Sequence, residues 1–592
     1  MTLNILNKIN EPKDLKYLSR EELNLLSSEI RHVLIKRVST TGGHFGPNLG
    51  MVEATIALHY VFNSPVDKFV YDVSHQSYVH KMLTGRKEAY INPEKFKTVT
   101  GYTEPKESEH DFFTIGHTST SISLACGLAK GRDAVGSNEN IIAIIGDGSL
   151  SGGEAYEGLN NAAASNKNII ILVNDNDISI AENHGGLYKN LAQLRENEGK
   201  LDNNFFKSLG FEYHFVKDGN NLESLIETFE KVKDTTRPVV VHMHTIKGKG
   251  YEDAENNKES FHWVMPFDLE TKEPLFKGEY VKSYGDITED FLIEKAKKDK
   301  SIVAITAATP GIVGVNRFRS ELQDQYVDVG IAEEHAIALA SGMAKRGAKP
   351  VAAFLSSFIQ RTYDQLSQDL AINNNPATIM VYWGGISGSD VTHLGLFDIP
   401  LISNIPNMVY LAPTTKEEHL AMVDWAIEQD KHPVAIRVPN MEVVSTGVGV
   451  EANFDELNKY VMVEEGKDVA IIGLGSFFHL GKKVQERLRN TGINATLINP
   501  RFITGVDEDL LNELKENHKV VITLEDGILD GGFGEKIARF YGNSQMRVLN
   551  FGATKEFTDS VELDVLYERY HLTEELIVED IEKVLADIKV FA

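Results

Sequence analysis

The residues with the clearest potential for chemistry follow two apolar stretches of the chain. Gly146-Asp147-Gly148 ends the run IIAII, and Asn174-Asp175-Asn176 ends the run IIILV. A Gly/Ala/Glu-rich stretch of helical character separates the two runs. In a right-handed βαβ unit, neighbouring parallel strands end side by side, and ligands bind beyond those ends. Asp147 and Asn176, which are 29 positions apart, should therefore bring their oxygen atoms into one small volume.

This set of oxygen atoms suits a hard divalent cation. The carboxylate of Asp147, the amide carbonyl of Asn176 and a backbone carbonyl at Ile178 are the ligand types that Mg²⁺ takes, together with water and phosphate oxygens. The flanking glycines would let a diphosphate approach the backbone closely. A Gly-Asp-Gly tripeptide alone more often marks an ordinary turn. The order strand, Gly-Asp-Gly, helix, strand, Asn-Asp-Asn favours a metal and diphosphate site.

Strands and helices must position these residues. Three stretches of the chain show the expected pattern, in which short apolar runs alternate with helical patterns. Continuous apolar strands between helices predict parallel sheets that are covered on both faces. The runs are 141–149, 169–176 and 238–245; then 303–308, 326–335, 350–356 and 377–385; then 468–476, 495–500, 519–527 and 546–552. We therefore predict an α/β fold of three domains, at 1–275, 290–445 and 462–592. The expected linkers are about 264–290 and about 440–465.

Composition narrows the class of protein further. The 592 residues carry a formal net charge of −26, which disfavours a polyanionic partner such as nucleic acid. Cys126 is the single cysteine, so no intrachain disulfide can form, and a reducing compartment is expected. No apolar run approaches the length of a membrane span, and the first residues lack the apolar core of a secretory signal. We expect an enzyme of the cytoplasm that acts on small molecules, without a nucleic-acid or membrane partner.

Several further segments resemble one known family. They are TGGHFGPNLG (41–50), DVSHQSYVHKMLTGR (72–86), ESEHDFFTIGHTSTSIS (107–123), KGKGY (247–251), DVGIAEEHA (328–336), SFIQRTYDQ (357–365) and THLGLFD (392–398). Together with the Gly-Asp-Gly and Asn-Asp-Asn turns, they resemble the 1-deoxy-D-xylulose-5-phosphate synthase family, which is related to transketolase. The resemblance runs from about residue 15 to the C-terminus and is weakest after about 440.

The resemblance implies a homodimeric thiamine diphosphate enzyme with Mg²⁺. Its three domains would bind the diphosphate, bind the pyrimidine and form a transketolase-type C-terminal domain. The family joins pyruvate, with loss of CO₂, to glyceraldehyde 3-phosphate, and it serves isoprenoid and thiamine biosynthesis. Glu333 matches the glutamate that hydrogen-bonds the pyrimidine N1′, and Phe358 matches the aromatic ring that stacks on the pyrimidine. The other matches to cofactor contacts are His75, Gly116, His117, Thr118, Gly148, Ser149, Asn176 and Tyr251.

Three histidines match positions beside the reacting carbon. His44, His262 and His393 lie in Gly-flanked or charged loops, and imidazole can move protons near neutral pH. Taken one at a time, each histidine would more often be structural. The resemblance implies that the substrate is held by Arg361, Asp390 and Arg437.

The sequence departs from the family pattern on the side of the aldehyde acceptor. Trp383 takes the place of the arginine in the family's Asp-Arg-Ala-Gly stretch, Asn440 replaces a second arginine, and Leu355 replaces a tyrosine. The run that contains Asp390 is one residue shorter. Each lost charge-assisted phosphate contact costs about 1.5–3 kcal/mol. Weaker use of a phosphorylated acceptor is expected unless Arg361, Arg437 or lysines compensate.

Three alternatives stay open from the sequence. A paralogue could transfer a two-carbon unit to a different aldehyde. A non-catalytic relative is disfavoured, because Asp147, Asn176, Glu333 and the histidines are all kept. A dinucleotide oxidoreductase that binds its cofactor at GLGSFFHLG (473–481) is disfavoured. The dinucleotide-binding motif Gly-x-Gly-x-x-Gly requires glycine at the position of Phe478.

Overall fold

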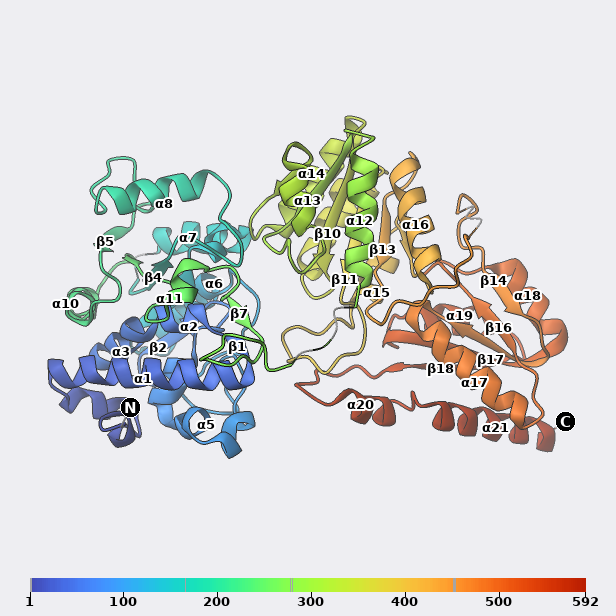
Figure 1. Ribbon diagram of the computed structural model, residues 1–592, viewed down its shortest axis with the longest axis horizontal. Coiled ribbons are helices and arrows are strands. Elements are labelled where there is room, and N and C mark those ends of the chain that lie inside the picture. The colour runs from blue at the N-terminus through green and yellow to red at the C-terminus, as the bar shows by residue number, and fades with distance from the viewer. Residues whose placement is uncertain (1–2, 166, 277, 279–280, 451–453, 592) are drawn as a thin grey trace. The chain divides into compact units, whose positions relative to one another are not determined.

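The computed structural model describes residues 3–165, 167–276, 278, 281–450 and 454–591 (Figure 1). The chain forms two compact units. The first comprises Met1–Glu279 with Gly330–Ala332, and the second comprises Tyr280–Val329 with Glu333–Ala592. Each unit is described by itself below.

Unit 1 is built on a five-stranded sheet in the order β2-β3-β4-β6-β5, and every neighbouring pair in it is parallel. The strands are β2 (Lys68–Tyr71), β3 (Ile141–Gly146), β4 (Ile170–Asp175), β5 (Glu212–Val216) and β6 (Val239–His244). In the register of β3 and β4, Gly146 lies opposite Asn174. The two turns singled out in the sequence therefore follow neighbouring strands, as predicted.

Helices cover both faces of this sheet because residues of each strand point alternately to opposite sides. Ile142 and Ile144 pack with α1, α3 and α10, whereas Ile141 and Ile145 pack with α6 and α7. The helices of unit 1 are α1 (Arg20–Thr41), α2 (Gly46–Gly50), α3 (Val52–Val61), α4 (Tyr78–Lys81), α5 (Glu88–Ile91), α6 (Ser121–Val135), α7 (Gly153–Ala164), α8 (Gly186–Glu196), α9 (Phe205–Leu209), α10 (Leu222–Val232) and α11 (Glu252–Asn256), with shorter turns η1 (Leu6–Lys8), η2 (Pro12–Tyr17), η3 (Met82–Arg86), η4 (Pro93–Thr98) and η5 (Gly148–Ser151).

Unit 2 holds two more sheets. The first has the order β12-β13-β11-β10-β8-β9 and is wholly parallel. Its strands are β8 (Ile302–Thr306), β9 (Tyr326–Asp328), β10 (Lys349–Leu355), β11 (Thr378–Tyr382), β12 (Val409–Leu411) and β13 (Val434–Arg437). Its helical segments are α12 (Tyr284–Ala296), α13 (Asn316–Glu321), α14 (Glu333–Lys345), α15 (Asp398–Ser403), α16 (Lys416–Glu428), η6 (Gln323–Gln325), η7 (Ile359–Thr362) and η8 (Gln365–Ala371).

The second sheet of unit 2 has the order β14-β16-β15-β17-β18. Its strands are β14 (Val461–Glu464), β15 (Asp468–Gly473), β16 (Thr496–Asn499), β17 (His518–Ile528) and β18 (Arg547–Ala553), and its helical segments are η9 (Gly475–Phe477), α17 (Phe478–Asn490), α18 (Glu508–Asn517), α19 (Phe533–Tyr541), α20 (Leu563–Arg569) and α21 (Glu574–Phe591). Helices α17 and α21 lie side by side and share one hydrophobic core with this sheet (Figure 1).

The predicted α/β class is confirmed, with one difference in the last sheet. Strand β14 runs antiparallel to β16. It is a short, half-exposed edge strand that enters directly from the irregular segment before it, so no crossover helix imposes a parallel direction. The predicted runs did not include β2, β5, β12, β13 or β14, and β14 lies within the expected second linker at about 440–465. Strand β5 lacks a continuous apolar run, and the other four are only three or four residues long. The three domain boundaries remain a prediction, and residues 451–453 of the second linker lie outside the described residues.

Within the described part of the chain, none of the helices combines the length and apolar character needed to cross a membrane.

Candidate active site

A pocket of about 110 Å³ opens in unit 1 beyond the carboxyl ends of β3 and β4. Asp147 follows β3, and Asn176 and Ile178 follow β4. All three line the pocket, as the strand register requires. The sequence-predicted residues Gly148, Ser149, Thr118, His75 and His262 also line it. His44, Gly116, His117 and Tyr251 are not among its lining residues.

The oxygen atoms at the floor of the pocket fit a divalent cation. Asp147 is buried, and its Oδ2 accepts a hydrogen bond of 2.8 Å from Asn183 Nδ2. The side-chain Oδ1 of Asn176 is buried and has no hydrogen-bond partner among the described residues. A buried polar atom without a partner costs free energy, so a ligand for this atom is expected. The described residues contain no group of three or more His, Cys, Asp or Glu that could hold a metal ion.

The electrostatic environment of Asp147 also favours a bound cation. Burial raises the pKa of its carboxyl group, and the nearby carboxylate of Asp175 raises it further. Asp175 itself is compensated, because Arg195 Nη1 lies 2.7 Å from each of its two oxygens and His242 Nε2 lies 2.8 Å from Oδ2. The charge of Asp147 is compensated only in part, by the hydrogen bond from Asn183 and by the nearby Lys247. A bound cation would remove that penalty.

The wall of the pocket next to Asp147 is shaped by close backbone packing. A Cβ atom added to Gly148 would lie 2.4 Å from the Cβ of Ser179, so this position must be glycine. The opposite loop is fixed by Asp72, whose two carboxylate oxygens accept from the backbone N–H groups of Ser119 and Ser121 at 2.8 and 3.0 Å. That loop presents Thr118 to the pocket. A narrow groove between backbone segments suits a diphosphate chain.

Three histidines meet at the edge of this pocket. The two-residue strands β1 (Gly43–His44) and β7 (Trp263–Val264) pair antiparallel, which brings His44 opposite Trp263 and close to His262. The ring centroids of His44 and His262 are 5.6 Å apart, and His75 lies 4.8 Å from His44 and 5.3 Å from His262. The structure thus gathers residues that are more than 200 positions apart in the sequence.

Lys247 is a pocket residue that sequence reasoning did not single out, although it lies in the KGKGY segment. Its side chain is buried, and Nζ lies 2.5 Å from the carbonyl oxygen of Ser179 and 3.0 Å from His262 Nδ1. When Lys247 is charged it only donates, so His262 then accepts at Nδ1 and carries its own proton at Nε2. Burial, with Lys247 next in importance, holds the pKa of His262 well below its usual value. His262 is therefore a neutral N–H donor.

Tyr251 lies beside this pocket rather than in its lining. Its ring packs 5.2 Å from Phe45, and its hydroxyl is buried without a hydrogen-bond partner among the described residues. Its match to a family cofactor contact stays a prediction.

A second group of predicted residues lies in unit 2, at the carboxyl end of β10. Glu333 begins α14 and is buried, and Arg361 Nη1 lies 3.5 Å from its Oε2. Burial raises the pKa of Glu333, and Arg361 opposes that effect. Phe358 and His393 face each other with ring centroids 5.6 Å apart. His393 Nδ1 lies 3.2 Å from Asp390 Oδ1, so Asp390 orients the imidazole.

Arg437 is the last residue of β13. Its guanidinium is bound within the protein, which does not favour the substrate role expected for it. Its Nε donates to Asp398 Oδ2 at 2.7 Å, and its Nη2 donates to the carbonyl oxygen of Asp526 at 2.7 Å. Its side chain is 8% exposed, and the carboxylates of Asp398 and Asp526 already compensate its charge. Trp383, by contrast, is 53% exposed and has a φ of +57° at the end of β11. We therefore leave Arg437 out of the residues proposed to hold the acceptor.

Because the pKa of Lys247 is lowered, the effect of Lys247→Met on stability should depend on pH. Burial lowers this pKa from 10.5 to about 7 in the folded chain, so between these values the unfolded chain binds more protons and stability rises with pH. In the cofactor-free protein, the gain in unfolding free energy from Lys247→Met should therefore be larger at about pH 6 than at about pH 9. Urea unfolding at several pH values measures the difference in unfolding free energy between the variant and the unaltered protein. Lys249→Met, two residues away, is the control, and a difference for Lys247→Met that does not vary with pH would contradict the assignment.

Comparison with known proteins bears on the whole chain. The family model described as 1-deoxy-D-xylulose-5-phosphate synthase matches residues 6–202 and 198–245. The models for the pyrimidine-binding and C-terminal domains of transketolase match residues 282–444 and 458–577. Among solved structures, transketolase from Campylobacter jejuni is 16% identical over 98% of this chain and 100% of that one, with a TM-score of 0.45.

Curated relatives carry the same name over nearly their full length. The 1-deoxy-D-xylulose-5-phosphate synthase of Halothermothrix orenii is 39% identical over 97% of this chain and 96% of that protein. The enzyme of Caldanaerobacter subterraneus is 39% identical over 98% of both chains, and that of Natranaerobius thermophilus is 38% identical over 90% of both. The chain belongs to the 1-deoxy-D-xylulose-5-phosphate synthase family.

Proposed function

We propose that this protein is a thiamine diphosphate-dependent and Mg²⁺-dependent carboligase. It condenses pyruvate, with loss of CO₂, with glyceraldehyde 3-phosphate and forms 1-deoxy-D-xylulose 5-phosphate. The observation that carries the proposal is the buried pair of Asp147 and Asn176 in a pocket walled by Gly148, with Asn176 Oδ1 lacking a partner among the described residues. The names of the relatives favour this acceptor over the other aldehydes that the sequence alone allowed.

The pocket of unit 1 would hold the charged end of the cofactor. Asp147, Asn176 and the carbonyl oxygen of Ile178 would ligate Mg²⁺, and the metal would neutralise diphosphate oxygens. Thr118, Gly148 and Ser149 would contact the diphosphate from the two walls. When bound, thiamine diphosphate would supply a nucleophilic carbon and an electron sink for decarboxylation.

In unit 2, Glu333 would meet the pyrimidine ring. A buried carboxyl group with a raised pKa readily keeps a proton, which it can share with the N1′ nitrogen. Arg361 beside it keeps the pKa from rising further, so the group can still release that proton. Phe358 would stack on the same ring, and the contact with His393 places an imidazole next to that stack.

The histidines would handle protons and oxygen atoms of the substrates. His262 is neutral and presents Nε2–H, so it is suited to donate a hydrogen bond to a carbonyl or carboxylate oxygen. His44, which contacts both other histidines, would exchange a proton with the reacting oxygen. His393, whose imidazole is oriented by Asp390, is also suited to move a proton.

We also propose that the protein is a homodimer of the cytoplasm. The family resemblance supports the dimer, and the single cysteine fits a reducing compartment.

Turnover tests the proposed reaction directly. Purified protein with thiamine diphosphate, Mg²⁺, pyruvate and glyceraldehyde 3-phosphate should release CO₂ and form 1-deoxy-D-xylulose 5-phosphate in equal amounts. Mass spectrometry of the product and trapping of labelled CO₂ measure both. Release of CO₂ only with a different aldehyde would show that the acceptor is wrong, and no release with any aldehyde would refute the proposed reaction.

Glu333 and its neighbour Glu334 offer a matched pair of variants. Glu333→Gln keeps the size of the side chain but cannot share a carboxyl proton, so kcat should fall by roughly 10²–10⁴-fold. Glu334→Gln changes the next residue in the same turn of α14 and should leave kcat within about twofold of the unaltered enzyme. Steady-state kinetics with saturating cofactor measures both. Equal effects of the two substitutions would remove the role given to Glu333.

A further inference from the structure

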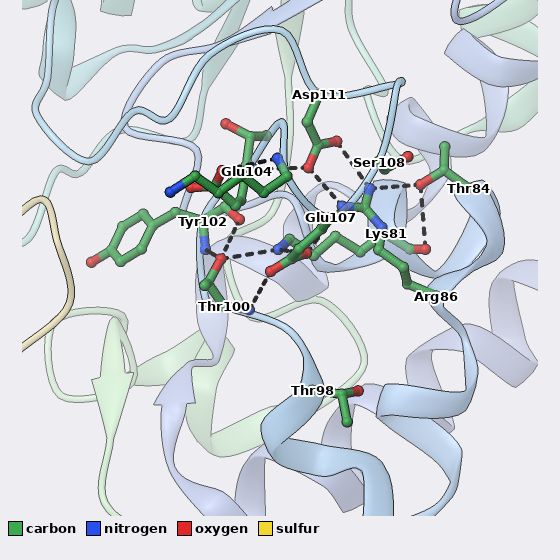
Figure 2. Close-up of polar contacts among 12 residues, drawn as sticks. Lys81, Thr84, Arg86, Thr98, Thr100, Tyr102, Glu104, Glu107, Ser108 and Asp111 are labelled. Atoms are coloured by element: carbon green, nitrogen blue, oxygen red, sulfur yellow. Dashed lines mark hydrogen bonds and ion pairs between the residues drawn. The ribbon is translucent and has the colours of Figure 1, made fainter. Parts of the chain in front are cut away.

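A buried network of charges holds a loop of unit 1 that lies outside the diphosphate pocket. Lys81 ends α4 and Arg86 ends η3, while Glu107 and Asp111 belong to the loop that follows η4 (Figure 2). Lys81 Nζ lies 2.6 Å from Glu107 Oε2. The Arg86 guanidinium binds Asp111 through two hydrogen bonds of 2.6 and 2.9 Å, and it reaches Glu107 Oε2 at 3.1 Å.

The same carboxylates also hold the backbone of the loop. Glu107 Oε1 accepts from the N–H of Thr100 at 2.6 Å, and Asp111 Oδ2 accepts from the N–H of Glu104 at 2.9 Å. The Thr100 hydroxyl accepts from Lys81 Nζ at 3.2 Å and donates to the carbonyl oxygen of Tyr102 at 2.9 Å. The residues between 100 and 104 therefore form a short arch that is fixed at both ends.

The arch carries Tyr102 toward the histidines. In Figure 2 the ring of Tyr102 points away from the charged cluster. Its centroid lies 6.0 Å from the ring of His44, which is in contact with His75 and His262. Tyr102 is not among the lining residues of the diphosphate pocket. Tyr102 therefore adjoins His44 outside the lining of that pocket.

Burying four charged side chains costs desolvation free energy, so stability alone does not explain this network. The charged side chains of Lys81, Arg86, Glu107 and Asp111 are between 0 and 13% exposed. Burial alone would raise the pKa of Asp111, yet hydrogen bonds from His80 and Arg86 hold it well below its usual value. Buried ion pairs add little net stability compared with apolar packing of the same volume. What they provide is directional geometry, because each carboxylate has fixed partners on both of its oxygens.

We propose that Tyr102 contacts the substrate beside His44, and that the network of Lys81, Arg86, Glu107 and Asp111 is a positioning device for it. The Tyr102 hydroxyl would donate to a carbonyl or carboxylate oxygen of a small 2-oxo acid or aldehyde. This inference rests on the proposed function only in placing the reaction at the three-histidine group.

Tyr102→Phe tests the contact. Loss of one neutral hydrogen bond should raise KM for pyruvate or for the aldehyde by about 5–10-fold, while the affinity for thiamine diphosphate stays within about twofold. The two KM values identify which substrate the hydroxyl meets. If both KM values and kcat stay within about twofold, Tyr102 does not contact the substrate and the proposal is overturned.

Thr100→Val tests the positioning, since it removes one hydroxyl from the network and keeps the shape of the side chain. It should raise the same KM as Tyr102→Phe, and the double variant should be no worse than Tyr102→Phe alone. Thr98→Val is the matched control, because this exposed hydroxyl bonds to the Lys95 carbonyl and lies apart from the network (Figure 2). Additive effects, or no effect of Thr100→Val, would contradict the positioning role.

Amide hydrogen exchange separates this inference from the proposed reaction. If the unaltered protein releases no CO₂, the reaction is wrong, but the network can still be tested. Arg86→Lys should speed exchange of the amides at 100–104, because lysine cannot make the paired bonds to Asp111. Arg501→Lys, which alters the buried pair with Glu418 in unit 2, should leave these amides unchanged. Unchanged exchange in Arg86→Lys would show that the network does not hold the arch.

Discussion

The pairing of β3 with β4 is the constraint on which the candidate site depends. Because Gly146 lies opposite Asn174, the turns that follow these strands leave the sheet together. Asp147 and Asn176 then share one pocket wall, where one carboxylate oxygen is satisfied by Asn183 and the amide oxygen of Asn176 is left for a ligand. A shift of one residue in this register would move one turn along the strand direction by about 3.3 Å relative to the other, and would separate the two side chains.

Buried charge is the second theme of the molecule, and compensation decides which charges are available for chemistry. Asp175 and Arg437 are both neutralised by partners within their own units. Asp147, Lys247 and Glu333 are buried, and each has a pKa shifted toward the neutral form. Such shifts concentrate at functional sites because a poorly compensated group gains most when a ligand arrives. Fully paired groups, by contrast, set geometry, as Arg86 and Asp111 do for the arch at 100–104.

Sequence patterns predicted most of the central strands because continuous apolar runs determine buried parallel strands, but they missed the short strands β2, β12 and β13. They predicted Asp147 and Asn176 because strand ends meet at one edge of such a sheet. They did not reveal Lys247 or Tyr102, since a lysine or tyrosine in a loop gives no sign of burial or of its neighbours. The pairing of Arg437 with Asp398 was not predicted for a similar reason: it joins residues that are 39 positions apart, and no local pattern shows this. The short edge strand β14 was not predicted, because its pairing with β16, and not its composition, makes it a strand.

The central claim is that Asp147, Asn176 and Ile178 hold a metal that carries the diphosphate. The most direct measurement is a crystal structure of the protein with thiamine diphosphate and Mn²⁺ in place of Mg²⁺, with the metal located by anomalous scattering. The account predicts one metal at about 2.1 Å from an Asp147 carboxylate oxygen, Asn176 Oδ1 and the Ile178 carbonyl oxygen, with diphosphate oxygens completing its shell. A metal bound elsewhere, or a diphosphate seated away from Gly148, would contradict it.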